Sequence, residues 1–496
     1  MGQPQGSIPH ESRVIRPLSH LEAYKSSLHL LRQHCGTVVS CRYSIADHVE
    51  NTKIKTAVER SVAISVLQHP LMQVALSNED SSRPFWISLR SIDFTRQLQW
   101  QFIKRTDDYT AQLETTIHNT LHKWFTELDA RPGWRLHILQ DESNPRAIDV
   151  VFCWHHAWFD GMSAKLFHRT LARNLNDEWA QSNLSSLVDG QLQLGDITIR
   201  FPPPIESLRK ISMSWGFTLL TIYRELFPAF LVARNPADVG WAPIRAAPYR
   251  TESRLITIDR STLESLLAAC REHSTTLTGL LNVLPLFSLA RQLGGDKMKA
   301  LSSVTAIDLR QFMPLKPSEF PWHEPAKTMD NEVSLIEENF DAGVVNRVRR
   351  GSAQQQSENT IKAKLQDMVW LLARRNRQKI RDKLSSDMEN DPVGLMHYVK
   401  DWRELMKSKL SKPRARSWGV TNLGSFESGE LKQWSIQGAR FHLSAEVNAP
   451  AFHISAVSVQ GGDLCVDIGW QEGIMDNAIG ERLAVDIEQW LKYLAA

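Results

Sequence analysis

Apolar side chains recur with helical spacing along several stretches of the chain. A repeat of about three to four positions predicts a helix with one face against a core, and four stretches show it: 54–68, 162–179, 359–386 and 478–494. The first of them ends at His69-Pro70, because proline cannot continue a helix. Two further helices are expected from about Ser261 and from about Thr275.

Shorter stretches rich in β-branched and aromatic residues predict strands between these helices. Residues 147–156, AIDVVFCWHH, are so continuously apolar that we expect them in the middle of a sheet. Further strands are expected at 134–141, 300–312, 417–426, 441–447, 451–459 and 464–471. The two halves of the chain share this rhythm of helices and strands, which predicts an α/β (α+β) fold class.

Three stretches depart from these patterns. Residues 180–207 are polar and contain a run of prolines, which is typical of a surface linker. Residues 211–233 form the longest apolar stretch but contain Arg224 and Glu225, so we expect a buried helix or the wall of a tunnel, with a membrane-surface segment as the alternative. Residues 342–358 are polar and low in complexity, and a mobile loop is expected there.

Length and composition narrow the class of protein. A chain of 496 residues predicts two domains, with three as the alternative. The net charge of +3 argues neither for nor against a polyanionic partner. Five scattered cysteines without a CxxC pair and an N-terminus without an apolar signal region indicate a reducing compartment, so we expect a cytoplasmic protein. The 16 tryptophans are best explained by aromatic packing, with a roomy apolar pocket as the alternative.

The candidate chemistry lies at residues 154–161, WHHAWFDG, between the predicted central strand and a predicted helix. The side chains of His155 and His156 point to opposite faces of a strand end, and no further His, Cys and Glu cluster at ligand spacing is visible, so no metal is expected. Ser163 lacks the GxSxG elbow of a nucleophilic hydrolase.

A general base remains as the chemical interpretation of the histidine pair. An imidazole can accept a hydroxyl proton near neutral pH. Asp160 can pair with a cation elsewhere and hold the loop, and Gly161 permits a close approach of chain and substrate. On the residues alone, a buried histidine beside a turn explains the motif equally well.

The motif and its flanks resemble those of the chloramphenicol-acetyltransferase-like acyltransferases, whose signature is HHxxxDG. That superfamily includes peptide-synthetase condensation domains and fungal alcohol acetyltransferases, and the fungal enzymes resemble this chain most. The shared features are RPLSHLEAY, a helix that ends in HP, WRLHIL, HHAWFDGMSAKLFH, AIDLRQF and SWGVTNLGSF. The DFGWG element of the plant branch is absent.

This resemblance implies two similar halves in a pseudo-twofold arrangement, each a mixed sheet flanked by helices, with an active-site tunnel between them. We expect an N-terminal half at 1–205, a crossover with an apolar helix at 206–250, and a C-terminal half at 251–496. The crossover helix corresponds to the apolar stretch described above.

The resemblance also implies roles for single residues. His156 is expected to be the general base and His155 a structural residue. Asp160 is expected to support the loop, with Arg310 as its partner across the two halves. Gly161 is expected to keep the channel open.

The opposite wall of the site is expected to come from the second half. Thr421 or Asn422 would line the acceptor side and donate to the developing oxyanion.

The expected reaction is transfer of an acetyl group from acetyl-CoA to an alcohol by direct attack on the thioester. We expect no permanently bound cofactor, no nucleic-acid partner and a monomer, with peripheral membrane contact as the alternative. A condensation-like enzyme that uses a carrier-protein thioester and a non-catalytic binding protein are the competing hypotheses. The basic residues between 374 and 383 are explained by a solvated helix face, with a phosphate-bearing ligand as the alternative.

Overall fold

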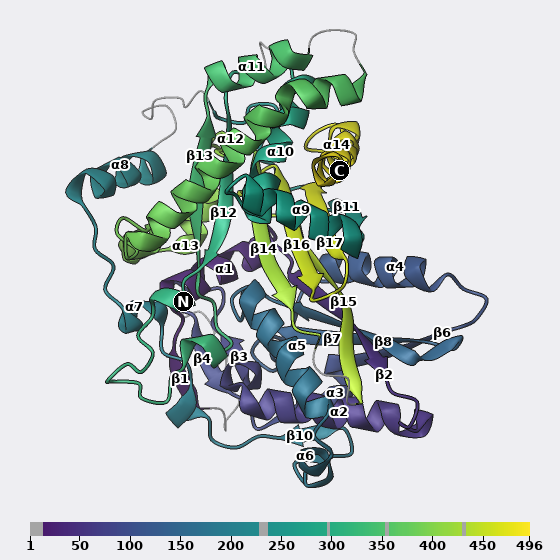
Figure 1. Cartoon of the computed structure of the whole chain (residues 1–496). Helices are drawn as coiled ribbons and strands as arrows, with labels where there is room; N and C mark the ends of the chain where they lie inside the picture. The colour runs from purple at the N-terminus through teal and green to yellow at the C-terminus, as the bar shows by residue number, and fades with distance from the viewer. Residues whose placement is uncertain (1–12, 228–236, 295–297, 353–356, 429–432) are drawn as a thin grey trace.

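Two sheets, one in each half of the chain, organise the structure (Figure 1). The computed structural model describes residues 13–227, 237–294, 298–352, 357–428 and 433–496. The first half contains strands β1 (Val14–Pro17), β2 (Thr37–Ile45), β3 (Val74–Ser77), β4 (Phe85–Ser88), β5 (Ser91–Asp93), β6 (Leu98–Ile103), β7 (Trp134–Asp141), β8 (Asn144–Trp154), β9 (Leu187–Val188) and β10 (Gln191–Gln193). The second half contains β11 (Thr251–Ile258), β12 (Leu301–Asp308), β13 (Val333–Phe340), β14 (Trp418–Phe426), β15 (Trp434–Leu443), β16 (Phe452–Val459) and β17 (Leu464–Gln471).

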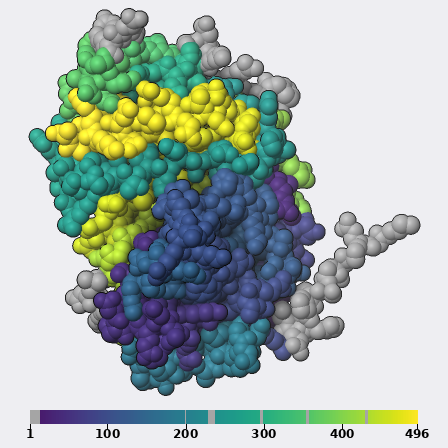
Figure 2. All heavy atoms as spheres, turned by 90° about the vertical axis from the view of Figure 1, so that its right-hand side faces the viewer, coloured from purple at the N-terminus to yellow at the C-terminus, as the bar shows by residue number. Residues whose placement is uncertain are grey.

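Helices cover both sheets. The first half and the crossover hold α1 (His20–Leu30), α2 (Asn51–Gln68), α3 (Phe94–Gln97), α4 (Tyr109–His122), α5 (Gly161–Leu175), α6 (Glu178–Ser182), α7 (Ile205–Leu208) and α8 (Trp215–Leu226). The second half holds α9 (Arg260–Glu272), α10 (Leu277–Gln292), α11 (Ala342–Ser352), α12 (Glu358–Ser385), α13 (Trp402–Lys409) and α14 (Asn477–Ala495). Figure 2 shows the two halves packed directly against each other on one face of the molecule.

The five-stranded sheet of the first half has the order β15-β2-β8-β7-β6. Its central strand is β8, which pairs antiparallel with β2 on one side and with β7 on the other. Every residue of β8 from Ala147 to Trp154 is buried, so the prediction of a central strand from continuous apolarity is confirmed.

The six-stranded sheet of the second half has the order β11-β17-β16-β14-β12-β13. Strand β14 lies between β12 and β16 and runs parallel to both, while the outer pairs are antiparallel. Helix α10 packs against α12, α14 and β14, and nearly all of its side chains are buried. The expected mixed α/β fold with two sheet-containing halves is confirmed.

Strand β15 joins the two halves. It follows β14 in the chain, yet it pairs antiparallel with β2, from Trp434 opposite Ile45 to Leu443 opposite Thr37. The second half of the sequence therefore supplies an edge strand to the sheet of the first half (Figure 1).

Many of the tryptophans serve the cores, as the first interpretation of their number proposed. The fully buried ones are Trp86, Trp134, Trp154, Trp158, Trp418 and Trp470. Their large apolar area contributes strongly to core stability.

Two expectations from the sequence are wrong. Residues 342–352 form helix α11 rather than a mobile loop, because Val344, Val345 and Val348 fall on one helical face and are buried. Residues 353–356 of that stretch lie outside the described ones, and Ser357 caps α12, which begins at Glu358. The apolar stretch 211–233 is not a buried helix over its described part, since Trp215 of α8 is 82% and Leu219 63% exposed. Its residues 228–233 lie outside the described part of the chain.

Candidate active site

The WHHAWFDG segment forms a short, tightly held loop between β8 and α5. The His155 N–H donates to Gly133 O at 2.8 Å, and the Trp154 indole donates to Phe159 O at 2.7 Å. A side chain at Gly133 would meet the Trp158 ring at 2.6 Å, so only glycine permits this packing. The loop thus holds its histidines in a fixed orientation.

The two histidines occupy different environments. His155 is fully buried, whereas His156 keeps part of its surface exposed. The amide Nδ2 of Asn331, from the segment before β13, donates to the His156 carbonyl oxygen at 2.5 Å. The same amide nitrogen lies 3.4 Å from His156 Nδ1.

Burial lowers the pKa of His156 to about 3, and the nearby Lys25 ammonium acts in the same direction. The Glu446 carboxylate opposes the shift. Burial has this effect because it disfavours the charged imidazolium. His156 is therefore neutral, and able to accept a proton, at any physiological pH.

A buried polar cluster lies beside this ring. The ring centroid of His34 lies 5.6 Å from that of His156. The Glu446 carboxylate accepts a hydrogen bond from the Tyr24 hydroxyl at 2.9 Å and pairs with Lys25 Nζ at 3.3 Å. These groups come from α1, the loop after α1 and the loop after β15, and only Tyr24 belongs to a shared sequence feature, RPLSHLEAY.

Asp160 is enclosed by hydrogen-bond donors. Arg310 pairs with both of its carboxylate oxygens, with Nη1 at 2.7 Å from Oδ2 and Nη2 at 3.2 Å from Oδ1. The backbone N–H groups of Ser163 and Glu332 donate to the same carboxylate at 2.8 and 2.9 Å. These donors hold the pKa of Asp160 below its usual value against the opposing effect of burial. The carboxylate has its partners within the protein and links the first half to the second.

Gly161 allows α5 to approach β14. A Cβ atom there would lie 2.6 Å from Leu423 Cδ2. Strand β14 also carries the two predicted oxyanion residues. The amide of Asn422 donates to the Thr278 hydroxyl at 3.1 Å and its Oδ1 accepts from Gly424 N at 2.8 Å. Thr421 is half-buried, and its side-chain hydroxyl has no hydrogen-bond partner among the described residues.

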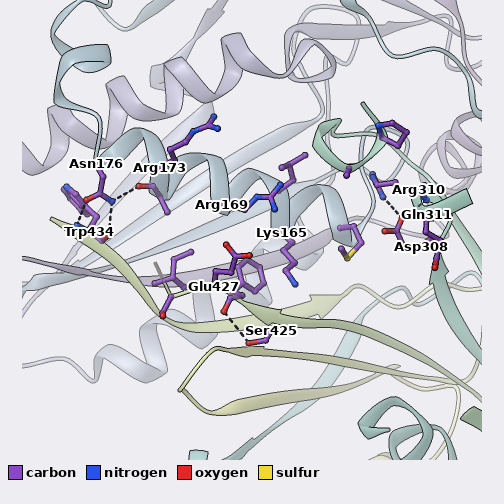
Figure 3. A pocket seen from close by; sticks show the side chains of 18 of the residues that line it. Lys165, Arg169, Arg173, Asn176, Asp308, Arg310, Gln311, Ser425, Glu427 and Trp434 are labelled. Atoms are coloured by element: carbon purple, nitrogen blue, oxygen red, sulfur yellow. Dashed lines mark hydrogen bonds and ion pairs between the residues drawn. The ribbon is translucent and has the colours of Figure 1, made fainter. Parts of the chain in front are cut away.

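A cavity of about 1130 Å³ opens between α5, the end of β14 and the start of β15. Lys165, Arg169 and Arg173 lie on successive turns of α5 along it, as Figure 3 shows, and the Arg310 side chain lies at one end. Glu427 faces Lys165 from the opposite wall. His156 is not among the residues that line this cavity.

The structure also brings together three groups with the spacing of metal ligands, a cluster that sequence spacing did not reveal. Glu79 Oε1 lies 3.5 Å from His29 Nδ1 and 3.4 Å from His155 Nε2. Backbone N–H groups, which can only donate, point at the other ring nitrogens: Phe125 N at His29 Nε2 and Ala157 N at His155 Nδ1.

These two hydrogen bonds place the ring protons on the nitrogens that face Glu79. A metal-bound histidine instead donates its second ring N–H outward, so the cluster does not fit a metal ion. Burial alone would raise the pKa of Glu79, but hydrogen bonds from His155 and His29 lower it to about 2. The Glu79 carboxylate therefore holds both imidazoles in place, and the ring of His155 with them.

The known proteins to which this chain is similar include alcohol acetyltransferases. The family model "Alcohol acetyltransferase" matches residues 92–320. "Probable alcohol acetyltransferase FCK4" of Fusarium pseudograminearum is 26% identical over 441 residues, which cover 88% of this chain and 85% of the relative. "Probable alcohol acetyltransferase crmB" of Aspergillus fumigatus is 22% identical and covers 84% of this chain and 86% of that protein.

Solved structures share the fold. The trichothecene 15-O-acetyltransferase of Fusarium sporotrichioides superposes with a TM-score of 0.73 at 13% identity, over 99% of this chain and 97% of that one. The first condensation domain of the CDA synthetase superposes with a TM-score of 0.61 at 12% identity, over 96% and 95%. The resemblance and the fold class expected from the sequence are confirmed: the chain is similar to fungal alcohol acetyltransferases and shares the fold of the trichothecene acetyltransferase and of the condensation domain.

Proposed function

We propose that the protein transfers an acetyl group from acetyl-CoA to the hydroxyl of an apolar small molecule. The observation that carries this proposal is the neutral, partly exposed His156, fixed beside the ion-paired Asp160 at the junction of the two halves. The likeness to alcohol acetyltransferases supports the same reaction class.

His156 acts as the general base. Its imidazole removes the proton of the acceptor hydroxyl while the oxygen attacks the thioester carbonyl and forms the new C–O bond. The tetrahedral intermediate then loses the thiolate, and His156 returns the proton to that sulfur. No acyl-enzyme forms, because the acceptor attacks the thioester directly. General-base catalysis of this kind contributes about 10²–10⁴ in rate.

The other residues position these groups. Asp160, with Arg310, holds the loop and does not touch substrate, and His155 anchors the loop through Glu79. The Thr421 hydroxyl donates to the oxyanion, a role that suits it better than Asn422, whose amide is already bonded to Thr278. A preorganised donor stabilises the charge that develops on the carbonyl oxygen.

The cavity along α5 suits the acyl donor. Its volume of about 1130 Å³ is large enough for an extended cofactor-sized molecule. Lys165, Arg169 and Arg173 form a stripe of positive charge along one wall, which matches the phosphates of CoA. We assign phosphate binding to this stripe.

The test is acetyl transfer by the purified protein. Acetyl-CoA is incubated with a panel of apolar alcohols, free thiol is followed with a thiol reagent, and products are identified by mass spectrometry. The His156→Ala variant should lose about 10²–10⁴ in kcat with its circular dichroism unchanged. His118→Ala, at another half-buried histidine on α4, is the matched control and should keep the wild-type rate.

Two results would contradict the proposal. Full activity of the His156→Ala variant would remove the base from the mechanism. If the wild type transfers the acyl group only from a carrier-protein thioester and never from acetyl-CoA, the donor is wrong, and the condensation-like alternative takes its place.

A further inference from the structure

Two imidazoles near His156 each carry a buried nitrogen without a hydrogen-bond partner among the described residues. His34, in the loop after α1, is 2% exposed, and the unpaired atom is its Nε2. On β16 the Nε2 of His453 is also buried, and it too is unpaired within the described ranges. Buried polar atoms are nearly always hydrogen-bonded, because an unpaired one costs free energy of folding. Both nitrogens therefore need a partner that the described chain does not supply.

Both rings belong to the buried polar cluster beside the candidate base. The ring centroids of His34 and His156 lie 5.6 Å apart. The charge of the Glu446 carboxylate acts on all three imidazoles, and the charge of His453 also acts on His34. The three rings therefore lie around one carboxylate, and the two unpaired nitrogens lie in one small region next to His156.

The pairing of the strands turns His453 toward the first half of the chain. Alternate residues of a strand point to opposite faces. On β16, Val457 packs in the core of the first half and Ile454 in that of the second, and His453 shares the face of Val457. Thr421 of β14, the neighbouring strand in Figure 1, pairs in register with Ser455 and projects from the same face. His453 and the proposed oxyanion donor Thr421 therefore both point toward the half that carries the candidate base.

The chemistry of this region suits an uncharged oxygen. Burial lowers the pKa of His453 to about 4 and holds the pKa of His34 well below its usual value, so both rings are neutral. A neutral imidazole has one N–H donor and one acceptor nitrogen. The Glu446 carboxylate already pairs with Lys25 Nζ at 3.3 Å and accepts from the Tyr24 hydroxyl at 2.9 Å, so its charge is compensated. A hydroxyl or keto oxygen fits these groups, whereas a carboxylate or an ammonium group would be buried without a counter-charge.

The region lies apart from the cavity along α5 that suits the acyl donor. His34, His453 and Glu446 are not among the residues that line that cavity. The other reactant of an acyl transfer is the acceptor alcohol. Hydrogen-bonded nitrogen and oxygen atoms lie about 3 Å apart. Since the His34 and His156 ring centroids are only 5.6 Å apart, oxygens bonded to these two rings can belong to adjacent carbon atoms of one molecule, or to carbon atoms separated by one other.

We propose that His34 and His453 bind a second, uncharged oxygen of the acceptor. The substrate class is then an apolar alcohol with a further hydroxyl or keto group, on the carbon next to the reacting one or on the carbon after it. With the reacting hydroxyl on His156 and the second oxygen on the other two rings, the molecule is held in one orientation, which favours reaction at one of its oxygens. That such a molecule is the acceptor rests on the proposed acetyl transfer, whereas its binding does not.

Isothermal titration calorimetry of the full chain, without any acyl donor, tests this binding. The probes are octane-1,2-diol and octane-1,3-diol, with octan-1-ol as the analogue that lacks the second oxygen. The acid 2-hydroxyoctanoate carries a carboxylate in place of the second hydroxyl. We expect at least one diol to bind at least about tenfold more tightly than octanol, because octanol leaves the buried nitrogens unpaired. The carboxylate should bind more weakly than that diol, since burial of its charge is costly.

Two variants remove the partners of the second oxygen one at a time. His34→Leu and His453→Leu should each weaken the binding of the preferred diol at least about fivefold and leave that of octanol unchanged. Both variants replace a buried unpaired nitrogen by an apolar group, so they should keep the circular dichroism of the wild type and be at least as stable in urea. His118→Leu removes a half-buried imidazole on α4 and is the matched control, with wild-type affinity for every probe.

Four outcomes overturn the proposal. The wild type binds the diols no more tightly than octanol, or it binds none of the probes, or both leucine variants keep the wild-type preference for the diol. Tightest binding of 2-hydroxyoctanoate assigns the region to a carboxylate instead. The titrations contain no acyl donor, so a failure of acetyl transfer leaves them unchanged, and the two proposals are tested separately.

Discussion

Removal of either partner from the Asp160–Arg310 ion pair should destabilise the protein strongly. Removal of the second partner as well should add little further loss. Asp160 is 3% and Arg310 8% exposed, and the two groups are joined by two hydrogen bonds. Breaking a buried pair leaves an uncompensated buried charge and costs about 3–5 kcal/mol. For Asp160→Asn we expect the lower end, about 3 kcal/mol, because Asp308 still lies 3.1 Å from the guanidinium.

Arg310→Gln should cost the upper end, about 5 kcal/mol, because Asp160 then faces the nearby carboxyl of Glu332 without a cation. The double variant D160N/R310Q carries neither charge and should lose no more than the worse single variant. The coupling free energy in this double-mutant cycle is then at least about 3 kcal/mol.

Urea unfolding at pH 7, followed by tryptophan fluorescence, measures these differences through linear extrapolation. Arg310 lowers the pKa of Asp160 in the folded protein, so the stability that this carboxylate provides is present above 3.8 and is lost as the pH falls through its folded value. The cost of Asp160→Asn should therefore shrink in acid. If the loss in the double variant equals the sum of the single losses within about 0.5 kcal/mol, the two side chains act independently and the reasoning is refuted.

The remaining predictions concern single residues. Because burial lowers the pKa of His156 to about 3, kcat/KM for acetyl transfer should show no acid limb between pH 6.5 and 5, and a limb near 6.5 would contradict the assigned environment. Burial raises the pKa of Glu332 to about 8, so the wild type should lose stability as the pH rises from 4.5 to 8. Urea unfolding at both pH values tests this: the Glu332→Gln variant should be more stable than the wild type at pH 8 and not at pH 4.5. Arg169→Glu should raise the KM for acetyl-CoA at least about fivefold with kcat little changed, since it removes a charged phosphate contact, and an unchanged KM would remove that residue from the donor site.

The position of the loop between β8 and α5 could be predicted because its signals are local. Asp160 precedes a strongly amphipathic helix and accepts from Ser163 N as an N-cap, and the central position of β8 follows from its unbroken apolar run. The placement of Arg310 against Asp160 came from a resemblance, since nothing in the spacing of two residues 150 positions apart indicates a contact.

The features of the site that the sequence did not predict depend on contacts between distant segments. Asn331, Glu79 and Glu446 carry no motif and become recognisable only when the fold brings them to the histidines. Helix α11 was missed because its few valines lie among charged residues, so that polarity concealed a buried face. For α8 the apolar pattern predicted a helix, which the structure contains. The pattern could not show whether the apolar face of this helix meets a core or the solvent.

The pairing of β15 with β2 also constrains how this chain can be made. A ribosome releases β2 long before β15, so the edge of the first sheet stays open during most of translation, and open strand edges invite misassembly with other chains. Any fragment that stops before Trp434 lacks the strand that closes this edge. If the gene is split before Trp434, the first sheet should gain its edge strand only when both segments are co-expressed.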